Sequence, residues 1–162
     1  MLHRLQYIII QSFARICTGE YNISGINFQW TDGLFGLAVS PRRDDGTKTL
    51  YFHAFSAVRE FSVPTSVVKN ESLASADNYY LFKLEGEKGQ LTQGTSMAVD
   101  LQTGIIYFTQ MNRHGIACWN PKVPLSPSTF SEYYIVLKFS FCYPRILEMR
   151  IEAIYSIDRN RD

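Results

Sequence analysis

Two segments of the chain repeat one pattern of short strands and turns, and this repeat limits the possible folds more than any other feature. Leu37-Ala38-Val39-Ser40 parallels Met97-Ala98-Val99-Asp100, and Leu50-Tyr51-Phe52 parallels Ile106-Tyr107-Phe108. The repeat distance is about 56–60 residues, which approaches the roughly 40–50 residues of a β-propeller blade when longer loops are allowed. The repeat predicts two consecutive blades of an all-β fold, and the pattern alone leaves a β-sandwich of hairpins open as the alternative.

Each segment contains three runs rich in Tyr, Phe, Val, Ile and Thr and bounded by turn-forming residues, as is typical of β-strands. The expected strands are Phe35–Val39, Thr49–Phe55, Glu60–Val63, Ser96–Val99, Ile105–Gln110 and Ile116–Trp119. Between the two sets, residues 64–75 predict a short helical turn and residues 77–84 an outer strand. After them, residues 122–130 predict a loop, residues 133–143 a strand, and residues 146–157 a helix outside the repeat.

Composition and charge narrow the functional classes. The chain has 162 residues, of which 46% are hydrophobic and 19% charged, so it can form a packed core. The formal net charge is only +1, whereas proteins that bind nucleic acid through phosphate contacts usually carry a basic excess. No run approaches the roughly 18 apolar residues of a membrane helix. We therefore expect no nucleic-acid partner and no membrane insertion.

The cysteines and two glycosylation motifs bear on the cellular compartment. Cys17, Cys118 and Cys142 form no CxxC pair, so a cysteine-rich zinc site has no support. Their odd number leaves two alternatives, a buried free thiol or a secreted protein whose pairing partner lies outside this stretch. Asn22 and Asn70 each begin an N-glycosylation motif, which favours secretion.

Several motifs in the repeated segments resemble those of one protein family. They are Phe28 to Pro41, Leu50-Tyr51-Phe52-His53, Arg59 to Val63, Thr65-Ser66, Gly104 to Phe108, Asn112-Arg113 and Cys118-Trp119-Asn120. Together they are similar, in the same order, to the insect yellow / major royal jelly protein family, and they cover about residues 21–126. The resemblance implies a fragment of a six-bladed β-propeller, with an atypical N-terminus over residues 1–20 and a non-family tail over residues 127–162.

The same resemblance implies an extracellular protein, although the apolar run at residues 7–10 is too short for a convincing signal peptide. We expect a small-ligand-binding or structural propeller linked to pigmentation, cuticle or glandular secretion. The alternatives are a dopachrome-converting enzyme of the melanin pathway, with isomerase-type chemistry, or an inactive truncated product. The resemblance assigns no catalytic residue to this stretch, and we expect no cofactor.

In a propeller, the loop that enters the innermost strand and the loop between the second and third strands lie at one end of the central channel. The candidate ligand-binding residues at this channel mouth are Trp30, Asp32, Phe35, Thr95, Ser96, Asn112 and Arg113. Aromatic and polar groups that converge there suit a small aromatic amine or catechol-type ligand. Packing between blades remains an alternative role for Trp30 and Phe35, and turn capping remains one for Asp32.

The three histidines, His3, His53 and His114, are far apart in the sequence and show no helical i, i+4 spacing, so metal binding has little support. His53 follows an aromatic strand, and the favoured role for it is that of a hydrogen-bonded structural histidine. No nucleophile elbow and no phosphate-binding loop occurs in the sequence.

Overall fold

The computed structural model describes residues 20–23, 25–29, 33–70, 72–73, 76–113 and 115–134. The helix predicted at residues 146–157 and most of the strand predicted at residues 133–143 lie outside this part of the chain. So do four residues discussed above: Trp30, Asp32, His3 and His114.

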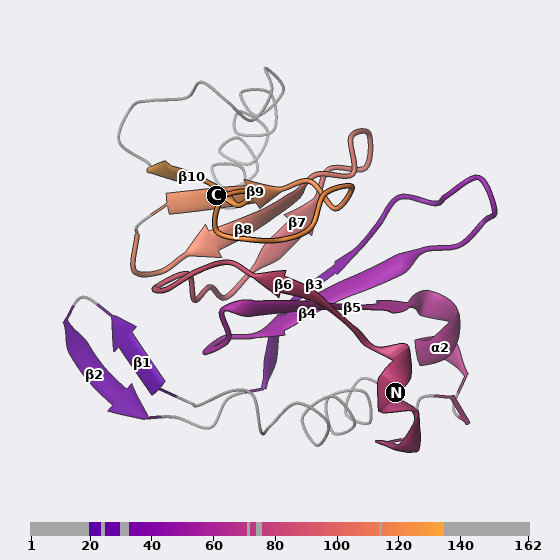
Figure 1. The fold of residues 1–162 in the computed structure, drawn as a ribbon, viewed down its shortest axis with the longest axis horizontal. Coiled ribbons are helices and arrows are strands. Elements are labelled where there is room, and N and C mark those ends of the chain that lie inside the picture. Colours follow the sequence, from indigo (N-terminus) through magenta and orange to yellow (C-terminus); the bar gives the residue numbers. More distant parts are fainter. Residues whose placement is uncertain are drawn as a thin grey trace, which may run out of the picture.

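Two four-stranded antiparallel sheets form the body of the molecule (Figure 1). The first blade consists of β3 (Leu34–Val39), β4 (Thr49–Ala54), β5 (Arg59–Pro64) and β6 (Lys83–Glu87), hydrogen-bonded in that order. The second blade consists of β7 (Met97–Val99), β8 (Ile106–Gln110), β9 (Gly115–Trp119) and β10 (Ser131–Tyr134), also in sequence order. This up-and-down order confirms the all-β prediction and the two consecutive blades.

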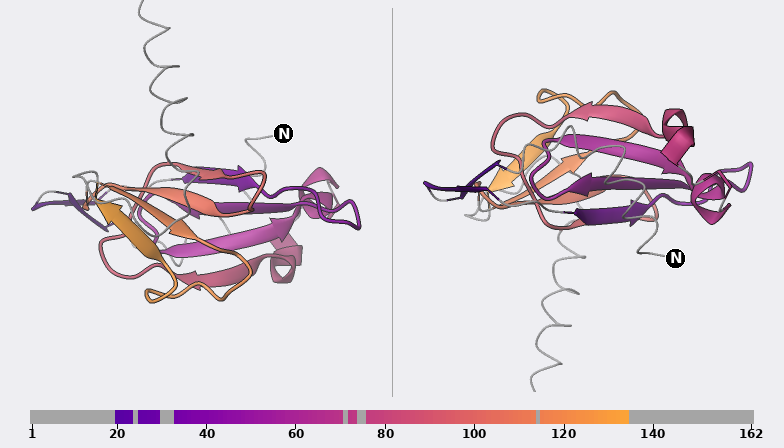
Figure 2. Two further views of the ribbon diagram at one scale, coloured as in Figure 1. Left: turned by 90° about the horizontal axis from the view of Figure 1, so that it is seen from above. Right: turned by 90° about the horizontal axis from the view of Figure 1, so that it is seen from below.

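A separate hairpin precedes the blades. It consists of β1 (Glu20–Ile23) and β2 (Ile26–Gln29), which pair with each other as a two-stranded sheet. Gly25, with a φ of 83°, occupies the turn between them, where a left-handed backbone favours glycine. Figure 2 shows the hairpin beside the two blades in both views.

The outer strand of the first blade begins later than the sequence predicts. Residues 77–84 were expected to form it, but Ala76–Leu81 is a 3-10 helix (η1), and β6 begins at Lys83. The Phe82 amide donates to the Tyr79 carbonyl at 3.0 Å, which closes a turn just before pairing with β5 starts. Tyr79 and Tyr80 are exposed, so the aromatic residues that suggested a strand here do not contribute to the core.

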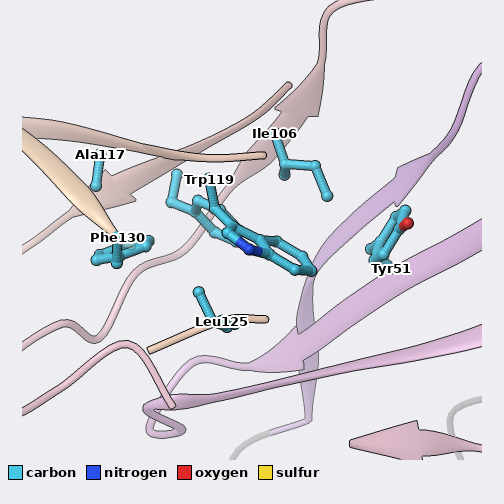
Figure 3. Packing of buried hydrophobic residues seen from close by; sticks show 7 residues of the cluster. Tyr51, Ile106, Ala117, Trp119, Leu125 and Phe130 are labelled. Atoms are coloured by element: carbon cyan, nitrogen blue, oxygen red, sulfur yellow. The ribbon is translucent and has the colours of Figure 1, made fainter. Parts of the chain in front are cut away.

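The faces of the two blades that meet form an apolar core (Figure 3). Tyr51 of β4 meets Trp119 of β9 edge-on, with ring centroids 5.8 Å apart. The other buried members of this cluster are Ile106, Phe108, Ala117, Leu125 and Phe130. Because the cluster combines Tyr51 of the first blade with side chains of the second, it fixes how the two blades pack.

A second cluster covers the opposite face of the first blade. Phe52 stacks on Phe61 with ring centroids 5.8 Å apart, and Val63 and Phe82 are also buried there. The short helix α2 (Thr65–Lys69), which matches the helical turn predicted at residues 64–75, contributes Val67. Alternation along β4 therefore sends Tyr51 toward the second blade and Phe52 away from it.

Candidate ligand-binding end of the blades

The strand register brings several loops to one end of the two blades. β3 begins where β4 ends, because Leu34 pairs with Ala54, and β6 ends beside the start of β5, because Glu87 pairs with Arg59. The linker between the blades, residues 88–96, hydrogen-bonds to both neighbouring turns. The Lys88 amide donates to the Val58 carbonyl at 2.8 Å.

The Met111 amide donates to the Gln93 carbonyl at 3.1 Å and so connects the same linker to the second blade. We use the term mouth for the end formed by the start of β3, residues 54–58, the linker and residues 111–113. Among the described residues, the 88–96 linker therefore lies beside the second-to-third turns of both blades.

Phe35 occupies an irregularity at the start of β3. Leu34 pairs with Ala54 and Gly36 pairs with His53, so Phe35 is an extra residue in this strand. Such a bulge re-aims a side chain at the edge of a sheet. Phe35 remains 44% exposed, and its ring lies 5.5 Å from that of buried Phe55 in the β4–β5 turn. Phe35 and Phe55 thus place two aromatic rings at the mouth.

Two predicted polar residues of the β8–β9 turn contact the linker. The Asn112 side-chain amide donates to Gln93 Oε1 at 3.3 Å, and Arg113 Nη2 donates to the Gln90 carbonyl at 2.9 Å. Through these hydrogen bonds both side chains lie against the 88–96 linker. They also use part of the hydrogen-bonding capacity of both groups to hold the loops together.

Thr95 and Ser96 are held mainly through their backbone. Both amides donate to Thr109 Oγ1, each at 3.0 Å. Just before them, Gly94 lies so close to the Thr109 carbonyl that a Cβ atom would overlap it. The linker therefore approaches β8 closely, and glycine is required at the point of contact.

A buried cluster of ionisable residues lies behind the mouth, in the interface between the blades. His53, at the end of β4, places Nδ1 2.9 Å from Glu60 Oε2 and Nε2 3.1 Å from the Gly94 carbonyl. Lys88 Nζ lies 3.5 Å from the same Glu60 oxygen. His53 and Glu60 are fully buried and Lys88 is 2% exposed.

The sequence predicted a hydrogen-bonded structural role for His53, and its geometry agrees. The two partners Glu60 and Lys88 were missed as members of a site. Glu60 begins an expected strand and Lys88 precedes a glycine, so neither carries a local signal of burial. A lysine and a glutamate far apart in sequence meet only because β5 and the end of β6 are neighbours.

Burial sets the electrostatics of this cluster. Desolvation lowers the pKa of Lys88, and the nearby Glu60 carboxylate acts in the opposite direction. Lys88 Nζ also lies 5.0 Å from the centroid of the Phe108 ring, which favours its charged form through a cation–π contact. The side chain is therefore held between an anion and an aromatic face in a water-poor interface.

Two buried polar groups have no hydrogen-bond partner among the described residues. They are Glu60 Oε1 and the side-chain amide of Gln110, of which both the oxygen and the nitrogen are unpaired. Gln110 is 3% exposed and lies two residues beyond Phe108 on the same face of β8, toward the mouth. Buried amides in folded proteins are normally hydrogen-bonded, so Gln110 marks a place where a ligand or water would be stabilised.

The glycosylation candidates and one cysteine lie elsewhere. Asn22 is in β1, and Asn70 is exposed at the C-terminus of α2, where its Oδ1 accepts from the Ser72 amide at 3.0 Å. Cys118 in β9 is disulfide-bonded, which excludes the free-thiol alternative for this residue. No group of three or more potential metal ligands occurs in the described part of the chain, and no helix there is long and apolar enough to cross a membrane.

Known proteins of one family are similar to this chain in sequence. A family model described as "Major royal jelly protein" matches residues 7–135, beyond the motifs at residues 21–126 in both directions. "Protein yellow" of Drosophila melanogaster is 36% identical over 110 residues, covering 67% of this chain and 20% of that protein. "Protein yellow" of Drosophila subobscura is 34% identical over 112 residues, with coverage of 68% and 19%.

A solved structure, "Streptogramin B lyase structure", superposes with a TM-score of 0.39 and 21% identity over 73% of this chain and 30% of that one. The chain spans about a fifth of the length of the curated relatives it matches. On the extent of the family match, and with two consecutive blades of a β-propeller, the chain belongs to the major royal jelly protein family.

Proposed function

We propose that this chain is part of a secreted propeller that binds a small aromatic amine or catechol-type molecule at the mouth. The observation that carries the proposal is the buried, unpartnered amide of Gln110. Its oxygen would accept from an ammonium or phenolic hydroxyl, and its nitrogen would donate to a phenolic oxygen. Ligand pockets commonly combine apolar and aromatic walls with a few such polar groups.

The aromatic residues of the mouth support the same ligand class. Phe35 and Phe55 present rings at the mouth, and rings attract cations through their faces. The described mouth supplies an aromatic surface and hydrogen-bonding groups.

Secretion is supported by two further observations. Cys118 forms a disulfide, and structural disulfides persist mainly in oxidising compartments. Asn70 and Ser72 of the second glycosylation motif are both exposed, so a glycan at Asn70 would meet no packing obstacle. We propose an extracellular location with glycosylation at Asn70 and Asn22. Peptide mass mapping before and after glycosidase treatment of the secreted chain tests both sites.

Isothermal titration calorimetry with dopamine and serotonin tests the binding proposal. We expect measurable binding to the wild-type chain and at least about a tenfold weaker affinity for Gln110→Leu, because loss of one well-formed hydrogen bond costs about 1.4 kcal/mol. Leucine fills a similar space without an unpaired amide, so the variant should fold. Gln102→Leu, at an exposed turn on the far end of β7, is the matched control.

Two results would contradict the proposal. One is the absence of binding heat at high protein concentration, and the other is equal affinity of wild type and Gln110→Leu. Dopachrome decay measured with the same proteins tests the alternative function as a melanin-pathway enzyme. His53 is fully buried, so an acceleration of that reaction would have to arise from other groups.

A further inference from the structure

We propose that the His53 ring and the Glu60 carboxyl group together hold two hydrogen-bonding protons inside the interface. Both protons are required for His53, on the first blade, to hydrogen-bond to the linker at Gly94 while it also contacts Glu60. The proposal concerns the buried cluster and is independent of any ligand at the mouth. It follows from which atoms can donate hydrogen bonds and which can only accept them.

Both neighbours of the His53 ring are ordinarily acceptors. The Gly94 carbonyl, 3.1 Å from Nε2, can only accept, so Nε2 must carry a hydrogen. The Glu60 carboxylate, 2.9 Å from Nδ1, also accepts when ionised. A neutral imidazole has only one N–H hydrogen. It therefore cannot donate both to the Gly94 carbonyl and to an ionised Glu60.

Two arrangements satisfy both contacts. Either His53 is an imidazolium next to a Glu60 carboxylate, or Glu60 is protonated at Oε2 and donates to Nδ1 while Nε2 keeps its hydrogen. The two differ only in the position of one proton between Nδ1 and Oε2. In each, the pair holds two protons and has no net charge of its own, so neither His53 nor Glu60 is a buried charge without a partner.

Few other ionisable groups face the pair in the described structure. From the linker, Lys88 contacts Glu60 Oε2 at 3.5 Å and favours the carboxylate form. On the same face of β4, Tyr51 has its pKa raised by burial, so its phenol stays neutral. From β6, Glu85 is engaged by Ser62 at 2.5 Å and by Lys83 at 2.7 Å. β8 contributes the uncharged Phe108 ring.

The shared proton has a mechanical consequence at the linker. If it were removed, either Nε2 would face the Gly94 carbonyl without a hydrogen, or Nδ1 would face the carboxylate without one. Gly94 is packed against the Thr109 carbonyl of the second blade and cannot retreat toward it. Deprotonation would therefore push the linker away from its position between the blades.

Nuclear magnetic resonance of the 15N-histidine-labelled full chain tests the proton count. At pH about 7.5, where a histidine in water is mostly neutral, we expect both ring nitrogens of His53 to show proton-bearing signals. In Glu60→Gln the side-chain amide can donate to Nδ1, so we expect a single proton at Nε2 and an unprotonated Nδ1. An unprotonated ring nitrogen in the wild type would overturn the proposal.

The pH dependence of unfolding gives a second measurement. It is made in Lys88→Met, because the lowered pKa of the buried lysine adds a pH dependence of the opposite sign. Between pH about 7.5 and 8.5 we expect the unfolding equilibrium constant of Lys88→Met to rise up to about tenfold, the linkage expected for one extra proton held by the folded state. In Glu60→Gln/Lys88→Met the rise should disappear. Equal slopes in the two variants would also overturn the proposal.

Discussion

The interface between the two blades has an apolar end and a charged end, and neighbouring residues of the same strand belong to different ends. On β4, Tyr51 contacts Trp119, whereas His53, two residues on, contacts Glu60 and Gly94. On β8, buried Ile106 belongs to the apolar end, and buried Gln110 lies at the opposite end of the strand. The apolar end gains stability in proportion to buried area, while the charged end is stable only when its hydrogen bonds are complete.

The largest expected effect is at the apolar end. Trp119 is 1% exposed, and its Nε1 donates to the Val123 carbonyl at 3.0 Å. Trp119→Ala should lower the free energy of unfolding by about 3–5 kcal/mol, because it leaves a cavity between the blades and frees a carbonyl. Urea denaturation followed by circular dichroism measures this loss. A loss below about 1 kcal/mol would mean that the blades do not depend on this contact.

At the charged end, Glu60→Ala should cost about 3 kcal/mol, since it leaves Lys88 and the His53 ring buried without their shared acceptor. The matched control is Glu87→Ala, which removes a carboxylate from an exposed ion pair with Arg59 at 2.7 Å and should cost at most about 1 kcal/mol. The comparison fails if the two substitutions have equal effects in the same denaturation experiment.

Gly36→Ala tests how closely β3 packs against the His53 ring at the charged end. A Cβ atom at Gly36 would overlap the His53 ring, so the ring or the strand must shift. We expect a loss of about 1–3 kcal/mol, typical of overpacking in a well-filled interior. In a double-mutant cycle with His53→Ala, the loss should be partly recovered because the smaller side chain makes room. Strict additivity would show that the ring is not the obstacle.

The smallest effect at neutral pH is expected for Lys88→Met, because Glu60 keeps its 2.9 Å contact with His53 Nδ1 and methionine fills the space without a charge to desolvate. The pH dependence of the stability difference between the wild type and Lys88→Met has a definite sign. The lowered pKa of Lys88 means that the unfolded chain binds more protons from that pKa up to about 10.5. The stability of the wild type relative to Lys88→Met should therefore rise with pH, as measured by denaturation at pH about 7 and 9.

The sequence predicted the strands of both blades well because their runs of β-branched and aromatic residues alternate around turn-forming residues. It placed the outer strand of the first blade wrongly, because Tyr79 and Tyr80 imitate a strand although they lie exposed in η1. Phe35, Asn112 and Arg113 do lie at the mouth, while Trp30 and Asp32 stay predictions outside the described residues.

The charged cluster could not have been found from local signals. Glu60 and Lys88 are 28 positions apart, and Gly94 is 41 positions from His53. Their contacts depend on the pairing of β5 with β6 and on the path of the linker between the blades. Gln110 also appeared only as part of a strand, since nothing in the local sequence indicates that its side chain is buried.

A parallel bridge between Gly86 of β6 and Leu125 connects the loop after β9 to the outer edge of the first blade. Gly86 has a φ of 150°, and a side chain there would overlap the Leu125 carbonyl. The two blades are thus also in contact through Leu125, which lies far along the chain from the 88–96 linker that connects them covalently. A single protease cut within residues 89–93 should leave two fragments that co-elute in size-exclusion chromatography, and fragments expressed separately should reassemble.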